Sequence, residues 1–178
     1  METSVNTLNN SKINVTELSD NLLAGLYASG YSNLEEINKE LYETILNRNK
    51  VFAKINYTSD VKIKTFLSSV LQSLITNSEK KILIIVEDEN KVEEYVKIFK
   101  KVSSFIDTIN VSSFLNMTEN DSVIVSVSSN ISRDTQIDNL DYIIIDNSID
   151  QHLSDNLTFS NVNKAILCDN INENIMTI

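Results

Sequence analysis

Asp146 is the residue whose place in the sequence most suggests chemistry. It follows the apolar run Tyr142–Ile145, which is typical of a buried strand, so its carboxylate would stand where that strand ends. A strand-end aspartate can ligate a metal ion, and Asp150, four residues later, could form a carboxylate pair with it. The chain carries 25 acidic residues, however, so chance explains this spacing equally well. We interpret Asp146 as a residue that ends a strand, and we expect no metal site.

Three further side chains could act as bases, nucleophiles or anion contacts. His152 lies close to Asp150 and could be a general base, but no candidate nucleophile accompanies it, and we expect a surface histidine. Cys168 ends another apolar run and is more typical of a small buried hydrophobe than of a reactive thiol. Lys62 stands near the start of a predicted helix and could meet an anion, although such lysines are usually solvated. One histidine and one cysteine also exclude a zinc site built from these residues, and we predict no catalytic residue.

The two glycines of the chain have a suggestive spacing. Gly25 and Gly30 are separated by four residues, as are the two glycines of a phosphate-binding loop. That loop follows a strand and opens a helix, whereas these two glycines lie within and just after a predicted helix. We therefore reject a phosphate-binding loop at this place.

The charge of the chain bears on its partners. The 178 residues include 15 basic and 25 acidic side chains, which gives a net charge of −10. Nucleic-acid-binding proteins usually present a basic face, because each phosphate contact needs a cation. We expect nucleic acid to be an unlikely partner and anionic membranes to repel the chain. No apolar run approaches the length of a membrane span, and the N-terminal residues lack the features of a secretion signal, so we expect a cytoplasmic protein.

Hydrophobic periodicity predicts the elements that would position these side chains. Residues 1–14 are polar, and we predict a disordered tail followed by one domain over residues 15–178. The expected helices are one from about residue 15 to Gly30, capped by Thr16 or Ser19, and others over 33–47, 60–76 and 89–101, the first of these capped by Asn33. The expected strands cover 51–55, 82–86, 108–110, 123–127, 142–145 and 165–168. Unbroken apolar strands that alternate with helices predict an α/β fold in which helices cover both faces of a parallel sheet.

The order and spacing of these segments resemble the first RecA-like domain of DEAD-box RNA helicases, especially the translation-initiation branch. The clearest match is Asn21–Tyr31, which resembles the stretch that precedes the family's Q motif. Further segments fall on the family's motifs in order, and these are residues 34–38, 50–62, 83–92, 123–130, 144–149 and 167–170. The resemblance covers about residues 15–175 and implies a three-layer RecA-like fold.

The same alignment implies a dismantled nucleotide site. Where the family has the glycines of its phosphate-binding loop, this chain has Thr58 and Asp60, and the lysine and threonine that follow are replaced by Val61 and Lys62. The vestigial positions, by this resemblance, are Tyr31, Asn38, Thr58, Asp60, Val61, Lys62, Asp146 and Asn147. Asn38 stands for the adenine-reading glutamine, and Asn147 stands for the glutamate that orients water. Since a lone aspartate such as Asp146 is worth little without its metal–phosphate complex, the resemblance implies no bound nucleotide, cofactor or metal.

The positions that would contact RNA are altered as well. Glu89 and Asn130 fall on two family arginines, and we expect no second RecA-like domain within these 178 residues. We therefore predict an inactive helicase-like domain that binds a protein, such as a helicase-binding scaffold of a translation or RNP complex, as a decoy or structural subunit. A second hypothesis is a residual RNA-binding module that uses Lys50, Lys54, Lys62 and Lys64. A third, ranked last, is an enzyme with a new site at the acidic strand ends.

Overall fold

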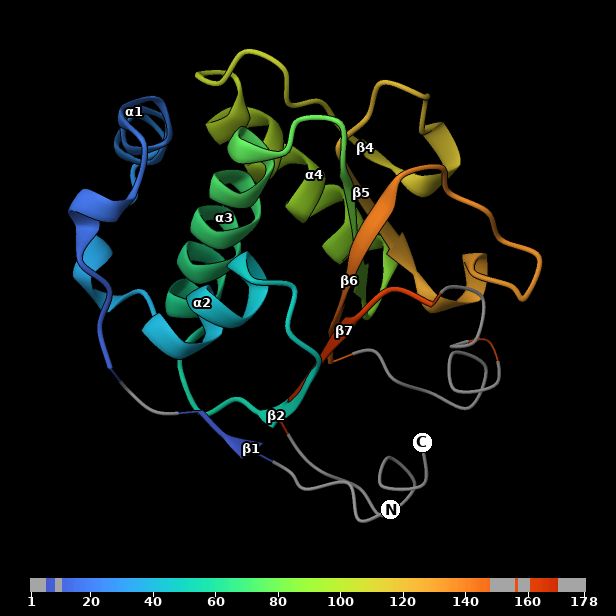
Figure 1. Cartoon of the computed structure of the whole chain (residues 1–178), viewed down its shortest axis with the longest axis horizontal. Coiled ribbons are helices and arrows are strands. Elements are labelled where there is room, and N and C mark those ends of the chain that lie inside the picture. The colour runs from blue at the N-terminus through green and yellow to red at the C-terminus, as the bar shows by residue number, and fades with distance from the viewer. Residues whose placement is uncertain (1–5, 9–10, 148–155, 157–160, 170–178) are drawn as a thin grey trace.

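The structure is a computed structural model that describes residues 6–8, 11–147, 156 and 161–169 (Figure 1). Its centre is a sheet of seven strands, all parallel, in the order β1-β2-β7-β6-β3-β5-β4. The strands are β1 (Asn6–Thr7), β2 (Val51–Lys54), β3 (Lys81–Val86), β4 (Val111–Ser113), β5 (Val123–Val127), β6 (Leu140–Asp146) and β7 (Lys164–Cys168). Every residue of β3 and of β5 is buried, as expected for central strands covered on both faces. The predicted parallel α/β sheet is confirmed.

Four α-helices lie on one face of this sheet (Figure 1). They are α1 (Asp20–Ala28), α2 (Lys39–Leu46), α3 (Ser59–Thr76) and α4 (Glu89–Ser103). Each begins after a residue whose side chain accepts a hydrogen bond from the first turn, and these N-caps are Ser19, Asn38, Thr58 and Asp88. None of the described helices is both long and apolar enough to cross a membrane.

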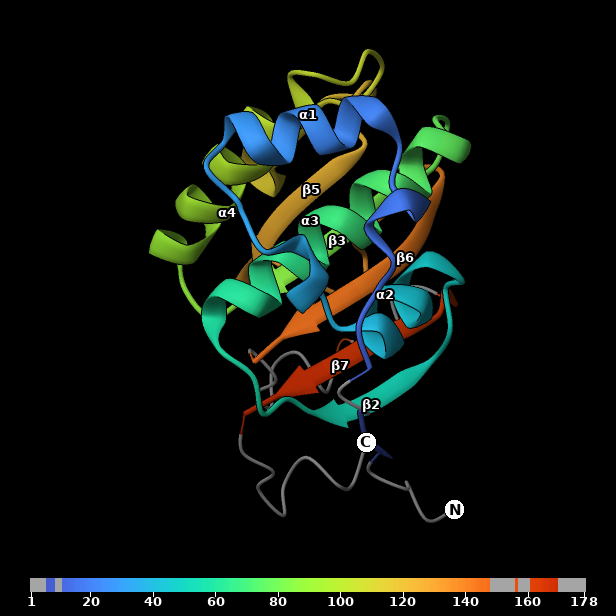
Figure 2. The ribbon, with the colours of Figure 1, turned by 90° about the vertical axis from the view of Figure 1, so that its left-hand side faces the viewer.

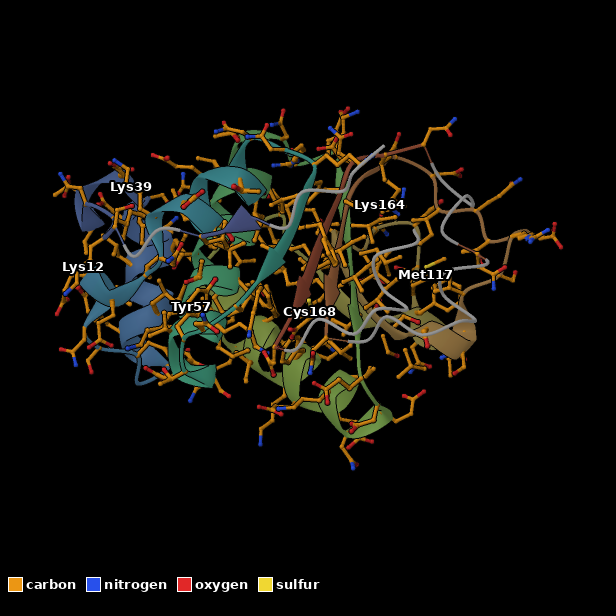
Figure 3. The ribbon with its side chains drawn as sticks, turned by 90° about the horizontal axis from the view of Figure 1, so that it is seen from below. Lys12, Lys39, Tyr57, Met117, Lys164 and Cys168 are labelled. Atoms are coloured by element: carbon orange, nitrogen blue, oxygen red, sulfur yellow. The ribbon has the colours of Figure 1, made fainter. Side chains whose placement is uncertain are left out.

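The other face of the sheet is covered differently. This face carries the strand side chains Leu83, Ile85, Ile124, Ile143 and Ile145. The described residues that pack against them come from the short 3₁₀ turn η3 (Phe114–Asn116) and from loops, and they include Phe114, Met117, Ile131 and Ile137. Figure 3 shows Lys12, Lys39 and Tyr57 on the helical side and Met117 on the opposite side. Within the described residues, α1 to α4 all lie on the face opposite to this second cluster.

Two predicted elements and one predicted helix cap differ in the structure. The helix predicted over 33–47 is interrupted, because Ile37 is not helical and Asn38 starts α2 as its N-cap, while Leu34–Glu36 form a 3₁₀ turn. Asn33, the predicted cap, has φ 53° and makes no capping hydrogen bond. The strand predicted over 108–110 instead covers Val111–Ser113, since Thr108 has φ 106°, which no strand accepts.

Part of the segment predicted as a disordered tail, residues 6–8 and 11–14, is described by the structure and lies against the domain. Asn6 and Thr7 pair with Ala53 and Lys54 of β2 as a short parallel edge strand. Leu8 and Ile13 are buried in the main core, and the backbone of Lys12 forms an isolated antiparallel β-bridge with that of Asn38. Two apolar side chains in a polar segment were too weak a signal for this docking.

Helix α1 crosses α4 at close range (Figure 2). A Cβ atom built on Gly25 would lie 2.4 Å from the carbonyl oxygen of Val102, so only glycine permits this approach. Gly30 has φ 87° and follows the end of α1, in agreement with the predicted helix stop. Gly25 is thus a packing residue, which supports the rejection of a phosphate loop.

Candidate functional site

Asp146 ends β6 and points to the helical side of the sheet, as Tyr142 and Ile144 do. Its side chain is buried and both of its oxygens are occupied. Lys62 Nζ from α3 lies 3.0 Å from Oδ1, and the Tyr95 hydroxyl from α4 donates to Oδ2 at 2.5 Å. A buried carboxylate without partners would be costly, and this pair and hydrogen bond satisfy it. Sequence reasoning singled out Lys62 and Asp146 but missed that they bind each other.

Tyr95 was not anticipated as a site residue. Its ring packs edge-on against Phe66 of α3, with 6.5 Å between ring centroids, which fixes the hydroxyl against Asp146. Burial, together with the negative charge of Asp146, raises the pKa of the Tyr95 hydroxyl, so this group is a proton donor to the carboxylate and not a base. The helical spacing of Val92, Tyr95 and Phe99 predicted an inward side chain, but not its partner.

The connection between β2 and α3 lies where the resemblance places the phosphate-binding loop. Thr58 N-caps α3: its Oγ1 accepts a hydrogen bond from Val61 N at 3.4 Å and its carbonyl oxygen accepts one from Lys62 N at 3.0 Å. Two backbone donors of the first turn are therefore already used. No glycine is present in this connection to widen it.

Tyr57 occupies space beside this loop. Its hydroxyl is buried and has no hydrogen-bond partner among the described residues, and its ring packs against the main core. Burial, and then the charges of Asp146 and Glu40, raise the pKa of this hydroxyl. An aromatic side chain therefore lies close to Asp146, where the resemblance puts a small residue of the loop.

Asp60 is exposed on the first turn of α3 and is paired. Its Oδ2 lies 2.8 Å from Lys64 Nζ, and the same ammonium group lies 3.5 Å from Glu36 Oε2. Burial alone would lower the pKa of Lys64, but hydrogen bonds to and charges on Asp60 and Glu36 outweigh it and raise the pKa. Of the four lysines proposed for a residual RNA face, Lys62 and Lys64 are thus held in internal ion pairs.

Asn147 ties three strand ends together. It has φ 53°, and its Nδ2 donates to Glu87 Oε1 at 2.8 Å and to Asp169 Oδ2 at 3.4 Å, while its Oδ1 accepts from Asp169 N at 3.2 Å. An amide suits this place because two carboxylates flank it. A glutamate, which the family has here by resemblance, would add a third negative charge.

The remaining vestigial positions have structural roles. Asn38, on the adenine-reading position, caps α2 through a bond from Leu41 N to its Oδ1 at 2.9 Å. Tyr31 is half-buried and lines a hollow of about 290 Å³ against α4, and burial raises the pKa of its hydroxyl. Cys168 is buried, as predicted, and burial and then Asp169 raise the pKa of its thiol, which opposes thiolate chemistry. His152 and Asp150 lie outside the described residues.

The two positions that the resemblance assigns to RNA-contacting arginines do come together. Asn130 Nδ2 lies 3.5 Å from Glu89 Oε1, at one end of a hollow of about 510 Å³ between α4 and η3. The structure therefore brings these two positions together and presents an acidic side chain there.

Comparison with known structures defines the class of this fold, which is that of the RecA-like domain of DEAD-box RNA helicases. The chain is similar to the RNA helicase Prp28 from Chaetomium thermophilum bound to ADP, with a TM-score of 0.71 and 15% identity over 93% of this chain and 47% of that one. It is also similar to Dbp5 from S. cerevisiae bound to Nup159, Gle1, IP6 and ADP, with a TM-score of 0.67 and 14% identity over 90% of this chain and 48% of that one. A hypothetical ATP-dependent RNA helicase from Sulfolobus tokodaii gives a TM-score of 0.65 and 12% identity over 90% of this chain and 53% of that one.

These likenesses confirm the resemblance at the level of the fold. The chain spans about half the length of the solved structures that it matches. No protein-family model matches the chain, and no curated protein matches it by sequence.

Proposed function

We propose that this chain is a helicase-like domain that neither binds nor hydrolyses nucleotide and that acts by binding another protein. The single observation that carries the proposal is that the Asp146 carboxylate is already bound by the Lys62 ammonium group and by the Tyr95 hydroxyl. In the family this chain resembles, an aspartate at the place of Asp146 holds a metal ion that is bound to the nucleotide phosphates. Here an ammonium group of the chain itself stands beside that carboxylate.

A nucleotide would have to displace these contacts. Separating a buried ion pair leaves an uncompensated charge, at a cost of about 3–5 kcal/mol. A bound metal–nucleotide complex would also face the carboxylate of Asp60 at the start of α3. We infer that binding at ordinary nucleotide concentrations cannot offset these costs.

The protein-binding role is supported by what the chain retains. The sheet and its helical layer enclose a continuous apolar core, whereas the resemblance implies that the charged groups that would contact nucleotide and RNA are changed. Dbp5, which shares this fold, is bound to the proteins Nup159 and Gle1 in one structure. By that analogy we propose a cytoplasmic decoy or structural subunit whose partner is a helicase-binding scaffold of a translation or RNP complex.

A residual RNA-binding module is a weaker candidate. Lys62 and Lys64 are engaged with Asp146, Asp60 and Glu36, so the proposed basic face is reduced to Lys50 and Lys54. The net charge of −10 opposes RNA further.

Isothermal titration with ATP and Mg²⁺ tests the dead nucleotide site. We expect no saturable binding tighter than about 100 µM, which corresponds to about −5.5 kcal/mol. A matched variant that combines Thr58→Gly, Asp60→Gly, Val61→Lys and Lys62→Thr restores the loop residues of the family and shows what a repaired loop contributes. Micromolar binding by the unmodified chain would overturn the proposal.

Affinity purification with and without ribonuclease tests the protein-binding role. We expect a stoichiometric protein partner that survives ribonuclease treatment. Co-purification that ribonuclease abolishes would support the RNA-binding candidate instead.

A further inference from the structure

We propose that the groove between α4 and η3, hereafter the α4 groove, binds a short segment of the partner protein in which a basic residue precedes or follows an apolar anchor. This inference rests on the proposed protein-binding function and names the surface and the chemistry of the segment. It departs from the RNA ligand that the resemblance implies for this region.

The α4 groove has a defined shape. One wall is the exposed side of α4, the opposite wall is residues 113–116, and buried side chains of α4 and β5, including Val92 and Val125, form the floor. It encloses about 510 Å³, which is enough for several side chains. Along α4 it extends from Glu89 to Lys100, about 16 Å at the helical rise, which matches about five residues of extended peptide.

The groove carries an exposed apolar seat. Leu115 is 70% exposed on η3, and two half-buried side chains, Phe114 of η3 and Val96 of α4, line the same groove. A single exposed apolar residue needs no explanation, but one that lines a hollow with two others offers an anchor site. We place the apolar side chain of the partner segment here.

The two ends of the groove have opposite charge. Glu89 and Glu93 stand at the end near Asn130, and Lys97 and Lys100 stand at the other end. Within the described residues none of these four side chains forms an ion pair, although Glu93 and Lys97 are one helical turn apart. Their charges are therefore available to a ligand.

Charge complementarity selects the occupant. A basic side chain suits the Glu89 end, where the exposed Glu87 and Asp88 add to the negative potential, and an acidic side chain suits the Lys100 end. A nucleic-acid strand would run its phosphates past Glu89 and Glu93, which repel them. The pattern fits a segment of about five residues that is basic at one end, apolar in the middle and acidic at the other.

Selection from a display library of random dodecapeptides against the whole chain tests this inference. The selected peptides are synthesised with a fluorophore, and their affinities are measured by anisotropy against the unmodified chain and three variants. Leu115→Asp removes the exposed apolar side chain, and Glu89→Lys reverses the charge at the acidic end of the groove. Glu79→Lys is the control, because it makes the same charge reversal at another exposed glutamate, which lies after α3 and away from the groove. All three sites are on the surface, and thermal unfolding checks that each variant is folded.

We expect peptides in which, over a span of about five residues, a large apolar residue has an arginine or lysine on one side and an aspartate or glutamate on the other. Leu115→Asp and Glu89→Lys should each weaken them at least tenfold, and Glu79→Lys should change their affinity less than twofold. Peptides that bind all variants equally, or a failure to select any peptide, would overturn the groove assignment. Tight binding of a labelled oligouridylate that Lys97→Glu abolishes would overturn it in favour of RNA. These results are independent of the ATP titration. Failure of the groove proposal would therefore leave the proposed absence of nucleotide binding untouched.

Discussion

Lys62 Nζ lies 3.0 Å from Asp146 Oδ1, and the two side chains are only 14% and 6% exposed. They come from α3 and from the end of β6, 84 residues apart in sequence. The pair therefore clamps a helix to the centre of the sheet at the place where a phosphate-bound metal would be held in the family this chain resembles. Its first consequence is for stability.

Replacing Lys62 with methionine should destabilise the fold by about 3 kcal/mol, because it leaves the Asp146 carboxylate buried beside only Tyr95. Urea unfolding measures the change. Adding Asp146→Asn to Lys62→Met should recover a large part of the loss, since the uncompensated charge is then gone. Lys39→Met is the control: Lys39 pairs with Glu43 on the surface, and its loss should cost less than about 0.5 kcal/mol. Equal costs for the two lysine variants would contradict the buried pair.

Two tyrosines give a matched test of the loop. Tyr57→Phe removes a buried hydroxyl that has no partner in the described part of the chain, so the free energy of unfolding should stay constant or rise by up to about 1 kcal/mol. Tyr142→Phe removes a hydroxyl that donates to Asn49 O at 2.6 Å, and it should lower that free energy by about 1–2 kcal/mol. Chemical denaturation of both variants measures the difference. A loss for Tyr57→Phe as large as that for Tyr142→Phe would mean that the Tyr57 hydroxyl has a partner.

Gly25→Ala should destabilise the crossing of α1 and α4. The new Cβ would lie 2.4 Å from Val102 O, a backbone atom that cannot move without shifting α4, so we expect a loss of about 2 kcal/mol or more. Thermal unfolding reports it. Asn21→Ala, at an exposed position of the same helix, should change stability by less than about 0.5 kcal/mol. A stabilising Gly25→Ala would show that helix propensity outweighs the contact.

The sequence was sufficient for the sheet and for most helices. The continuous apolar run Ile82–Val86 is typical of a strand buried on both faces, and it forms β3. Of the two caps predicted for the first helix, Thr16 and Ser19, the structure uses Ser19, and Gly30 follows the end of α1. It was insufficient where a long-range contact decides the local structure. Leu8 docks a polar segment at the sheet edge, and Asn38 breaks a continuous helical pattern because its side chain caps α2.

The residues of the candidate site could be chosen from the sequence, but their contacts could not. The resemblance implies that Lys62 and Asn147 stand at positions that differ from the family's motifs. It does not show that Lys62 reaches Asp146, or that Asn147 donates to Glu87 and Asp169, because those pairings depend on three-dimensional proximity between distant segments. Tyr95 escaped notice for the same reason, since an inward tyrosine is ordinarily a core residue.

Alkaline pH should unfold the protein before its buried tyrosines ionise. Burial raises the pKa of the Tyr31, Tyr42, Tyr57, Tyr95 and Tyr142 hydroxyls, that of Tyr42 from 10.0 to about 12. Because these folded-state values lie above the unfolded value of about 10, their contribution to stability is complete below pH 10 and is lost as the pH rises beyond it. Tyrosinate absorbance should therefore rise together with the loss of far-ultraviolet circular dichroism in a titration from pH 8 to 13. Ionisation of all the tyrosines in a chain that keeps its circular dichroism would contradict the burial of these five hydroxyls.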